Sequence, residues 1–186
     1  ISLSDQIALI ILSFVFIPLL ICIPYSLSMY DIGFLDSYFE SISGFTATGF
    51  SIIENIEVID EPLLMWRSSS QWLGGLLFLI ATIGTLGTRQ IKIKPTYLIS
   101  ESILGGNFYN NFYYNFIRIL LIYLFSTILV IFLYNLMNIR LLDAFNLGFT
   151  VISSGGFIPS DNLSNIIKND LQVFVLSITL LFPILN

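Results

Sequence analysis

The stretch Ser43-Gly44-Phe45-Thr46-Ala47-Thr48-Gly49-Phe50 indicates the fold of this chain more directly than any other. It returns in degenerate form as Thr150-Val151-Ile152-Ser153-Ser154-Gly155-Gly156-Phe157. Each copy is rich in small and hydroxyl-bearing residues and lies between two long apolar segments. Non-helical backbone is tolerated at membrane depth only where it is buried in protein or lines a water-filled path. Two such copies therefore predict a pore.

The composition predicts an all-α integral membrane protein. Hydrophobic residues make up 56% of the chain, charged residues 10%, and the mean hydropathy is +0.90. Long Ile/Leu runs with many Phe and Tyr favour lipid-facing helices over the alternating pattern of outer-membrane strands. One cysteine and no histidine argue against an intrachain disulfide and against metal or redox chemistry, so no cofactor is expected. No nucleic-acid partner is expected either.

The charged residues are distributed unevenly along the chain. Seven acidic residues and no basic residue occur from residue 31 to residue 61, whereas the segment from Thr88 to Arg118 is basic. Basic residues in short loops mark the cytoplasmic side of a membrane. The acidic segment is then expected outside, where its carboxylates either raise the local cation concentration or simply form a solvated loop.

Three long apolar runs predict membrane-spanning helices. Gln6–Tyr30 is long enough, at about 1.5 Å per residue, to cross a hydrocarbon core of about 30 Å. Pro18 and Pro24 predict a kink in it. The other spans are expected at Leu63–Leu86 and Phe116–Met137.

Two shorter runs predict half-helices that enter the membrane without crossing it, at Leu35–Phe45 and Leu142–Ile152. Asp36 is a candidate N-cap of the first. A last run, Leu171–Leu185, is expected to begin a fourth span that the sequence does not complete. Together with the first residue, Ile1, this predicts that the chain was excised from something longer.

Residues 35–56 align with residues 142–163 without a gap, which indicates an internal duplication. The repeating unit is a helix, a re-entrant half-helix with its loop, and a second helix, as in potassium channels. The first unit is predicted at residues 1–94 and the second, with a truncated last helix, at residues 95–186. Both units have the same topology, so an axis along the membrane normal is expected to relate them. The identical pairs are Leu35/Leu142, Asp36/Asp143, Gly49/Gly156, Phe50/Phe157 and Asn55/Asn162.

The repeated loops are predicted to form an ion-selectivity filter. The C-terminal end of a half-helix carries unpaired carbonyls and the negative end of the helix dipole, which stabilise a cation. Backbone carbonyls of the loop can then replace the ion's hydration shell. Glycine turns a carbonyl inward without steric cost, although it could also merely end a buried half-helix. The predicted filter comprises Ala47, Thr48, Gly49, Phe50, Ser154, Gly155, Gly156 and Phe157, with both phenylalanines packing around it. Potassium is expected on the carbonyls of Thr48, Gly49, Gly155 and Gly156.

These loops, together with Trp66-Arg67-Ser68 and Gln71-Trp72-Leu73-Gly74-Gly75, resemble the pore units of the TrkH/KtrB potassium-uptake proteins of the Trk/Ktr/HKT superfamily. The resemblance implies a potassium-translocating subunit with four pore units in one polypeptide, in the bacterial inner membrane. It also implies a homodimer in the bilayer and a cytosolic nucleotide-binding regulatory subunit of the TrkA/KtrA type. This chain matches only the first two pore units.

Arg67 has two interpretations in the predicted second span. It either pairs with Glu40 or Asp36 behind the filter or anchors the helix at the headgroups. Trp66 and Trp72 are expected at the membrane interface. The residues expected only to permit close helix packing are Gln71, Gly74 and Gly75.

Other functions fit the sequence less well. Two copies of this chain could assemble into a cation channel with four pore loops. A membrane enzyme lacks a nucleophile and base set, so the protein is predicted not to be an enzyme. A non-conducting anchor does not explain two matching loops. Channel and ion-coupled carrier are not distinguished, and the preference for potassium over sodium rests partly on the resemblance.

Overall fold

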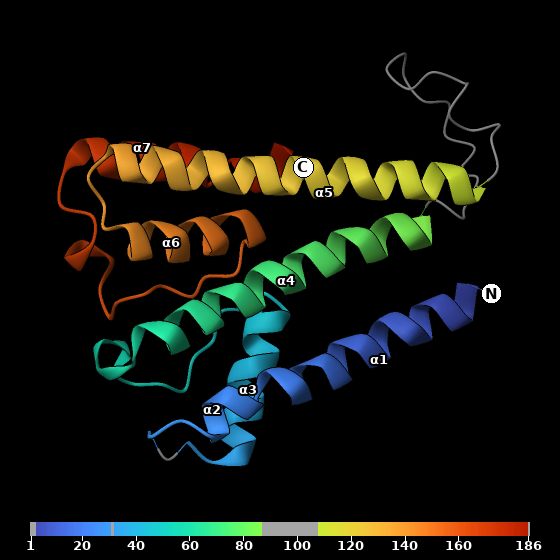
Figure 1. The fold of residues 1–186 in the computed structure, drawn as a ribbon, viewed down its shortest axis with the longest axis horizontal. Helices are drawn as coiled ribbons and strands as arrows, with labels where there is room; N and C mark the ends of the chain where they lie inside the picture. Colours follow the sequence, from blue (N-terminus) through green and yellow to red (C-terminus); the bar gives the residue numbers. More distant parts are fainter. Residues whose placement is uncertain (1–2, 31, 87–107, 186) are drawn as a thin grey trace.

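The computed structural model describes residues 3–30, 32–86 and 108–185, and all regular structure within these ranges is helical (Figure 1). The all-α prediction is confirmed. The long helices lie roughly side by side, and two shorter helices are placed between them. The elements are α1 (Leu3–Ile21), α2 (Ile23–Ser26), α3 (Phe34–Phe45), η1 (Ile56–Val58), α4 (Glu61–Leu86), α5 (Phe108–Leu136), α6 (Leu141–Ser153), η3 (Leu163–Asn165), α7 (Asp170–Thr179) and η4 (Phe182–Leu185).

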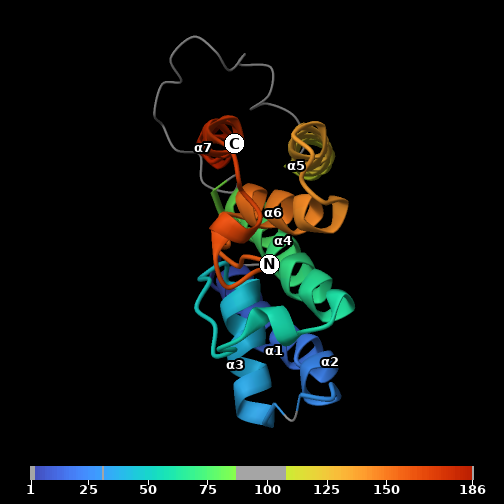
Figure 2. The ribbon, with the colours of Figure 1, turned by 90° about the vertical axis from the view of Figure 1, so that its left-hand side faces the viewer.

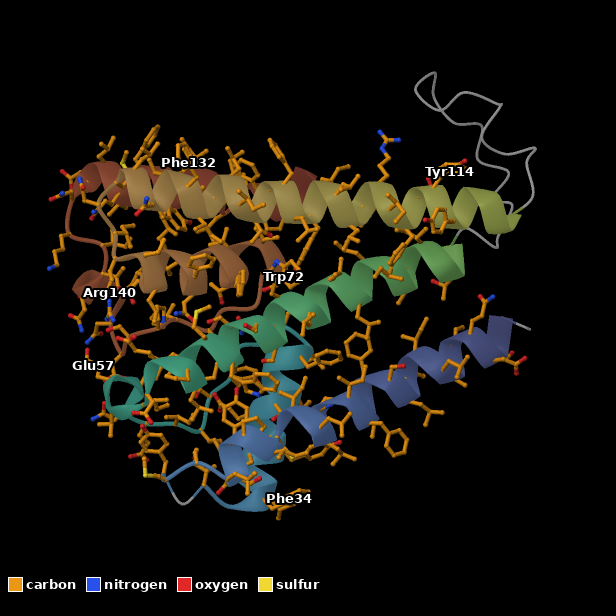
Figure 3. All side chains as sticks on the ribbon, viewed as in Figure 1. Phe34, Glu57, Trp72, Tyr114, Phe132 and Arg140 are labelled. Atoms are coloured by element: carbon orange, nitrogen blue, oxygen red, sulfur yellow. The ribbon has the colours of Figure 1, made fainter. Side chains whose placement is uncertain are left out.

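Two segments of the described chain are long and apolar enough to cross a membrane, Ser4–Ser26 and Tyr113–Leu136. The first comprises α1 and α2, which are separated at Cys22. Pro18 lies inside α1 and Pro24 in the first turn of α2, so the prolines account for the interruption. α5 exposes large apolar side chains along its outer side, among them Tyr114 and Phe132 (Figure 3). Such an apolar surface is suited to lipid.

The two half-helices are present where the sequence predicts them. α3 has 12 residues and α6 has 13, too few to cross about 30 Å at about 1.5 Å per residue. α6 begins beside the C-terminal end of α5 and ends partway along it (Figure 1). The N-cap prediction for Asp36 is wrong: Gly33 is the N-cap of α3, and Asp36 lies in the first turn. Its carboxylate still lies near the positive end of the helix dipole.

The internal repeat is visible in the order of the elements. Each half-helix is followed by an irregular loop, a short 3₁₀ helix and another α-helix, and η1 and η3 lie at equivalent positions. α1, α2 and α3 form one group, α5, α6 and α7 form the other, and α4 lies between them (Figure 2). The predicted boundary between residues 94 and 95 lies outside the described residues, as does most of the basic segment.

α4 is the central element because it packs against helices of both groups, namely α1, α3, α5 and α6. Its inward positions carry Arg67, Ser68, Ser70 and Gln71, which are all buried. This polar stripe makes α4, which is 26 residues long, less apolar than the segments Ser4–Ser26 and Tyr113–Leu136.

Trp72 of α4 is not an interface anchor, contrary to the sequence-based expectation. Its ring packs against Tyr123 and Phe149, with centroids 5.1 and 5.6 Å away, and its Nε1 donates to Thr127 Oγ1 at 3.0 Å (Figure 3). Trp66 is 39% exposed and donates from Nε1 to the carbonyl of Ile21. Trp72 therefore joins α4 to the second group of helices.

Candidate ion filter

The two repeated loops have positive φ at the same two positions. Ala47 and Ser154, which follow the half-helices, have φ of 53° and 55°, and Gly49 and Gly156 have φ of 79° and 80°. Among the described non-glycine residues only Asn138 shares a positive φ with Ala47 and Ser154. A left-handed conformation is costly for alanine and serine, so its recurrence at equivalent positions shows that the surrounding structure imposes it.

The loops are also closed by the same hydrogen bonds. Ser43 Oγ donates to the carbonyl of Phe50 at 2.5 Å, and Thr150 Oγ1 lies 2.6 Å from the carbonyl of Phe157. In the first loop the Thr48 N–H donates to the Ser43 carbonyl at 2.9 Å. In the second loop the Gly155 N–H donates to the Thr150 carbonyl, also at 2.9 Å. A hydroxyl-bearing residue in the last turn of each half-helix therefore closes the loop that follows the half-helix.

The loops touch one another at their glycines. A Cβ built on Gly49 would lie 2.5 Å from the carbonyl oxygen of Gly155 and 3.2 Å from Cα of Gly156. A Cβ on Gly156 would lie 3.6 Å from Cα of Gly49, which is ordinary contact. Gly49 thus lacks both the space and the backbone conformation for a side chain.

A cavity of about 320 Å³ lies where both half-helices end. Thr46 and Ala47 line it from the end of α3, and Ser153 and Ser154 from the end of α6. Two helix C-termini direct their partial negative charge toward this space, which favours a cation there. The Thr48 hydroxyl is 2.7 Å from that of Thr46, whose own proton goes to the Ile42 carbonyl.

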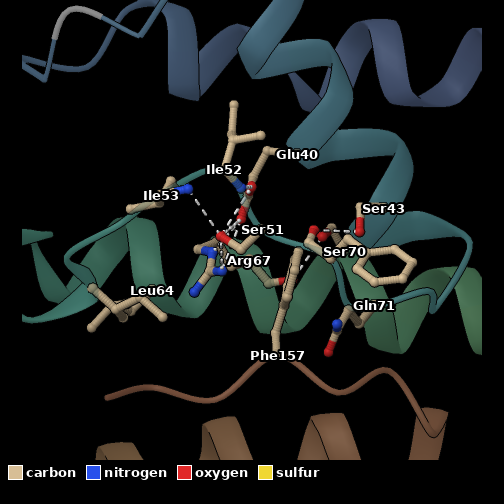
Figure 4. Close-up of polar contacts among 12 residues, drawn as sticks. Glu40, Ser43, Ser51, Ile52, Ile53, Leu64, Arg67, Ser70, Gln71 and Phe157 are labelled. Atoms are coloured by element: carbon tan, nitrogen blue, oxygen red, sulfur yellow. Dashed lines mark hydrogen bonds and ion pairs between the residues drawn. The ribbon is translucent and has the colours of Figure 1, made fainter. Parts of the chain in front are cut away.

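A buried ion pair supports the first loop (Figure 4). Arg67 Nη2 lies 2.8 Å from Glu40 Oε1, and Arg67 Nε donates to the same oxygen at 2.9 Å. The Glu40 carboxylate also accepts from Ser51 Oγ at 3.0 Å and from the Ile52 N–H at 3.1 Å. Glu40 therefore joins α3 to α4 and to the outer limb of the loop. Asp36, the other predicted partner of Arg67, is exposed.

The two filter phenylalanines differ in their surroundings. Phe157 is 2% exposed, and its ring lies under the Arg67 guanidinium, with 4.1 Å from Cζ to the ring centroid. Phe50, at the equivalent place in the first loop, is 69% exposed. The prediction that both phenylalanines pack around the filter therefore holds for Phe157. Phe50 is not enclosed in this way by the described residues.

Gln71 does more than permit close helix packing. It is fully buried, its Nε2 donates to the Gly155 carbonyl at 2.7 Å, and its Oε1 lies 2.5 Å from Thr150 Oγ1. The carbonyl of Gly155, one of the four predicted ligands, is thus held by a side chain. The sequence contains a signal for this role, because Gln71 follows Arg67 by four residues and lies on the same helix face.

Gly74 and Gly75 do allow α4 to approach its neighbours closely. A Cβ on Gly74 would lie 1.8 Å from the carbonyl oxygen of Phe45. A Cβ on Gly75 would lie 2.9 Å from the Tyr123 hydroxyl and 3.0 Å from Cβ of Ser153. Gly74 faces the first half-helix, while Gly75 faces the second.

Acidic side chains link the two units on the side where the half-helices begin. Glu57 Oε1 accepts from Asn165 Nδ2 at 2.7 Å, and Asp161 Oδ1 accepts from the Ile56 N–H at 2.7 Å. Arg140 forms an ion pair with Glu61, and both line a pocket of about 500 Å³ with Glu57 (Figure 3). Glu57 and Glu61 of the acidic segment thus contact residues of the second unit, so this segment is more than a solvated loop.

The apolar outer surface, the re-entrant half-helices and the paired loops define a membrane transport protein. The chain matches the TrkH family, whose description is cation transport protein, over residues 3–185, and it belongs to this family. The family consists of transporters rather than enzymes, as the sequence predicted.

Individual relatives agree with this assignment. The chain is 34% identical over 147 residues to an uncharacterized cation transporter of Methanocaldococcus jannaschii, covering 72% of this chain and 28% of the relative. It is 29% identical over 150 residues to the Trk system potassium uptake protein TrkI of Halomonas elongata, covering 81% and 30%. It is 26% identical over 132 residues to TrkG of Escherichia coli, covering 68% and 27%. The matches thus span less than a third of the relatives' length.

Proposed function

We propose that this chain supplies two of the pore loops of a potassium-uptake protein and that backbone carbonyls of these loops select the ion. The observation that carries the proposal is the pair of loops with matching positive φ at Ala47/Ser154 and Gly49/Gly156. In an extended strand, successive carbonyls point to opposite sides. A positive φ at every second residue instead turns successive carbonyls toward the same side. Within the described residues, the carbonyls of Thr48, Gly49 and Gly156 accept no hydrogen bond and are proposed as ligands, whereas the Gly155 carbonyl accepts from Gln71.

The electrostatics of the site support a cation as cargo. The ends of α3 and α6 line one cavity, so two helix dipoles act on the same space. Within the cavity lining no side chain carries a formal charge. Carbonyls and dipoles without a fixed carboxylate bind a monovalent ion weakly enough to release it, as conduction requires.

The distribution of charges and the family support a placement of the protein in the membrane. We propose residues 1–94 and 95–186 as the two pore units of a multi-pass protein of the inner membrane. The basic segment between α4 and α5 then faces the cytosol, where a nucleotide-binding regulatory subunit could dock, and a homodimer forms in the bilayer.

Replacing Gly49 with Ser in the complete gene product tests the filter. The added Cβ would lie 2.5 Å from the Gly155 carbonyl, so the two loops cannot keep their contact. We expect potassium-dependent growth of an uptake-deficient host to fall, or sodium uptake to rise relative to potassium. Ser177→Gly, on α7, is the matched surface control. Unchanged selectivity in Gly49→Ser would refute the filter assignment.

A further inference from the structure

Gln71 connects the helix of one unit to the loop of the other. It belongs to α4, and both of its hydrogen-bonding partners, Thr150 and Gly155, belong to the second half-helix and its loop. Figure 4 shows its side chain on the face of α4 that is turned toward this loop. A buried side-chain amide that donates to a carbonyl fixes the group that it binds, because breaking this bond leaves an unpaired buried polar atom.

The orientation of the Gln71 amide is determined by its neighbours. The Gly155 carbonyl can only accept, so the nitrogen must face it; the reversed amide would place two acceptors 2.7 Å apart with no proton between them. The Thr150 hydroxyl has one proton and two acceptors, Gln71 Oε1 at 2.5 Å and the Phe157 carbonyl at 2.6 Å. Gln71 therefore contacts the loop near its start and, through Thr150, near its end.

The Gln71 contact also explains why the two copies differ in sequence. A Cβ on Gly155 would lie 2.4 Å from both Cδ and Oε1 of Gln71, so the carboxamide lies directly against the Gly155 backbone. The equivalent residue of the first loop, Thr48, has a side chain and is exposed.

We infer that Gln71 is a positioning residue that sets the ion preference of the second loop from the first unit's helix. By holding the Gly155 carbonyl it fixes the adjoining peptide and hence the carbonyls of Gly156 and Phe157. This inference rests on the proposed function, since it assigns a role within the same filter. It predicts that the second loop loses its selectivity when the amide donor is lost, even though the loop sequence is intact.

The test uses Gln71→Met and Gln71→Glu in the complete gene product, with potassium and sodium uptake measured in liposomes across a range of pH. Met keeps the length of the side chain but has no donor, so we expect the potassium-to-sodium ratio to fall about tenfold at every pH. Protonated Glu keeps one donor toward Gly155, whereas its carboxylate repels the carbonyl. The ratio in Gln71→Glu should therefore be near that of the wild type at low pH and fall as pH rises.

Gln172→Glu is the matched control. Gln172, on α7, is also buried, and its Nε2 also donates to a backbone carbonyl, but to that of Met137 at 2.9 Å, just after the end of α5 rather than in a filter loop. It should alter stability without a pH-dependent ratio. Thr150→Val, which removes the second partner of Gln71, should lower the ratio in the same direction and serves if the Gln71 variants do not assemble.

Two outcomes distinguish a failure of the Gln71 inference from a failure of the proposed potassium-uptake function. A wild-type protein that does not prefer potassium would refute the proposed function. A selective wild type whose ratio is unchanged in Gln71→Met, or in Thr150→Val where the former does not assemble, would overturn the role of Gln71 alone.

Discussion

Arg67 and Glu40 are both almost completely buried, and neither charge has access to water. Such a pair is tolerated because each charge is neutralised by the other and because Ser51 and the Ile52 N–H satisfy further oxygen lone pairs. The pair ties the outer limb of the first loop to α3 and α4. Phe157 extends the arrangement to the second loop through its contact with the guanidinium.

Replacing Glu40 with Gln should destabilise the protein by about 3–5 kcal/mol, because the variant leaves the Arg67 charge buried without a counter-charge. The thermal transition of the purified protein in detergent, followed by circular dichroism, measures this loss. Asp36→Asn, on the exposed side of the same helix, loses only the interaction with the helix dipole and should change stability by less than about 1 kcal/mol. Equal effects of the two substitutions would contradict the assignment of Glu40 as the partner of Arg67.

At the scale of elements, α4 packs against α3 with one face and against α6 with another. Gly74 admits the end of α3, while Gly75 and Gln71 face α6 and its loop. The motif from Trp66 to Gly75 therefore has a physical explanation: small residues allow close approach, and the polar residues between them bind the loops.

We expect Gly74→Ala to be more damaging than its small size suggests. The added Cβ would lie 1.8 Å from the Phe45 carbonyl oxygen, a backbone atom that cannot move without shifting the end of α3. Overpacking of this kind costs about 1–3 kcal/mol, and here it displaces the start of the first filter loop. Melting temperature and potassium-dependent growth should both fall. Leu73→Ala, on the exposed face of α4, is the control, and a wild-type phenotype for Gly74→Ala would show that α3 and α4 are not in this contact.

The elements were more predictable from sequence than their contacts. Both half-helices begin and end within one residue of the predicted bounds, because apolar runs and Gly/Thr-rich loops are local signals. The roles of Trp72 and Gln71 were missed because their partners, Thr127 and Gly155, lie more than 50 residues away. A tryptophan looks the same in sequence whether its N–H meets a headgroup or a threonine.

At the scale of the whole molecule, the loop of the second unit is covered by a helix of the other unit, and the loop of the first unit is not. Phe157 is enclosed because α4 of the first unit supplies Arg67, whereas Phe50 is 69% exposed and no guanidinium of the described residues lies over it. The same relation, repeated about an axis, would enclose Phe50 against a helix from another unit. The first loop therefore has an unfilled side that further pore units, or a second chain, would cover.

These 186 residues alone should not conduct potassium. A ring of carbonyls must surround the ion, and this chain contributes two loops, one of which exposes Phe50. An open half-ring would also leave loop peptide groups facing lipid, at a cost of several kcal/mol for each unpaired group. The purified chain, reconstituted into liposomes at increasing density, should show no potassium flux above protein-free vesicles, whereas the complete gene product should. Flux that rises with the square of the chain's density would contradict this expectation and favour a channel in which two chains meet around the axis.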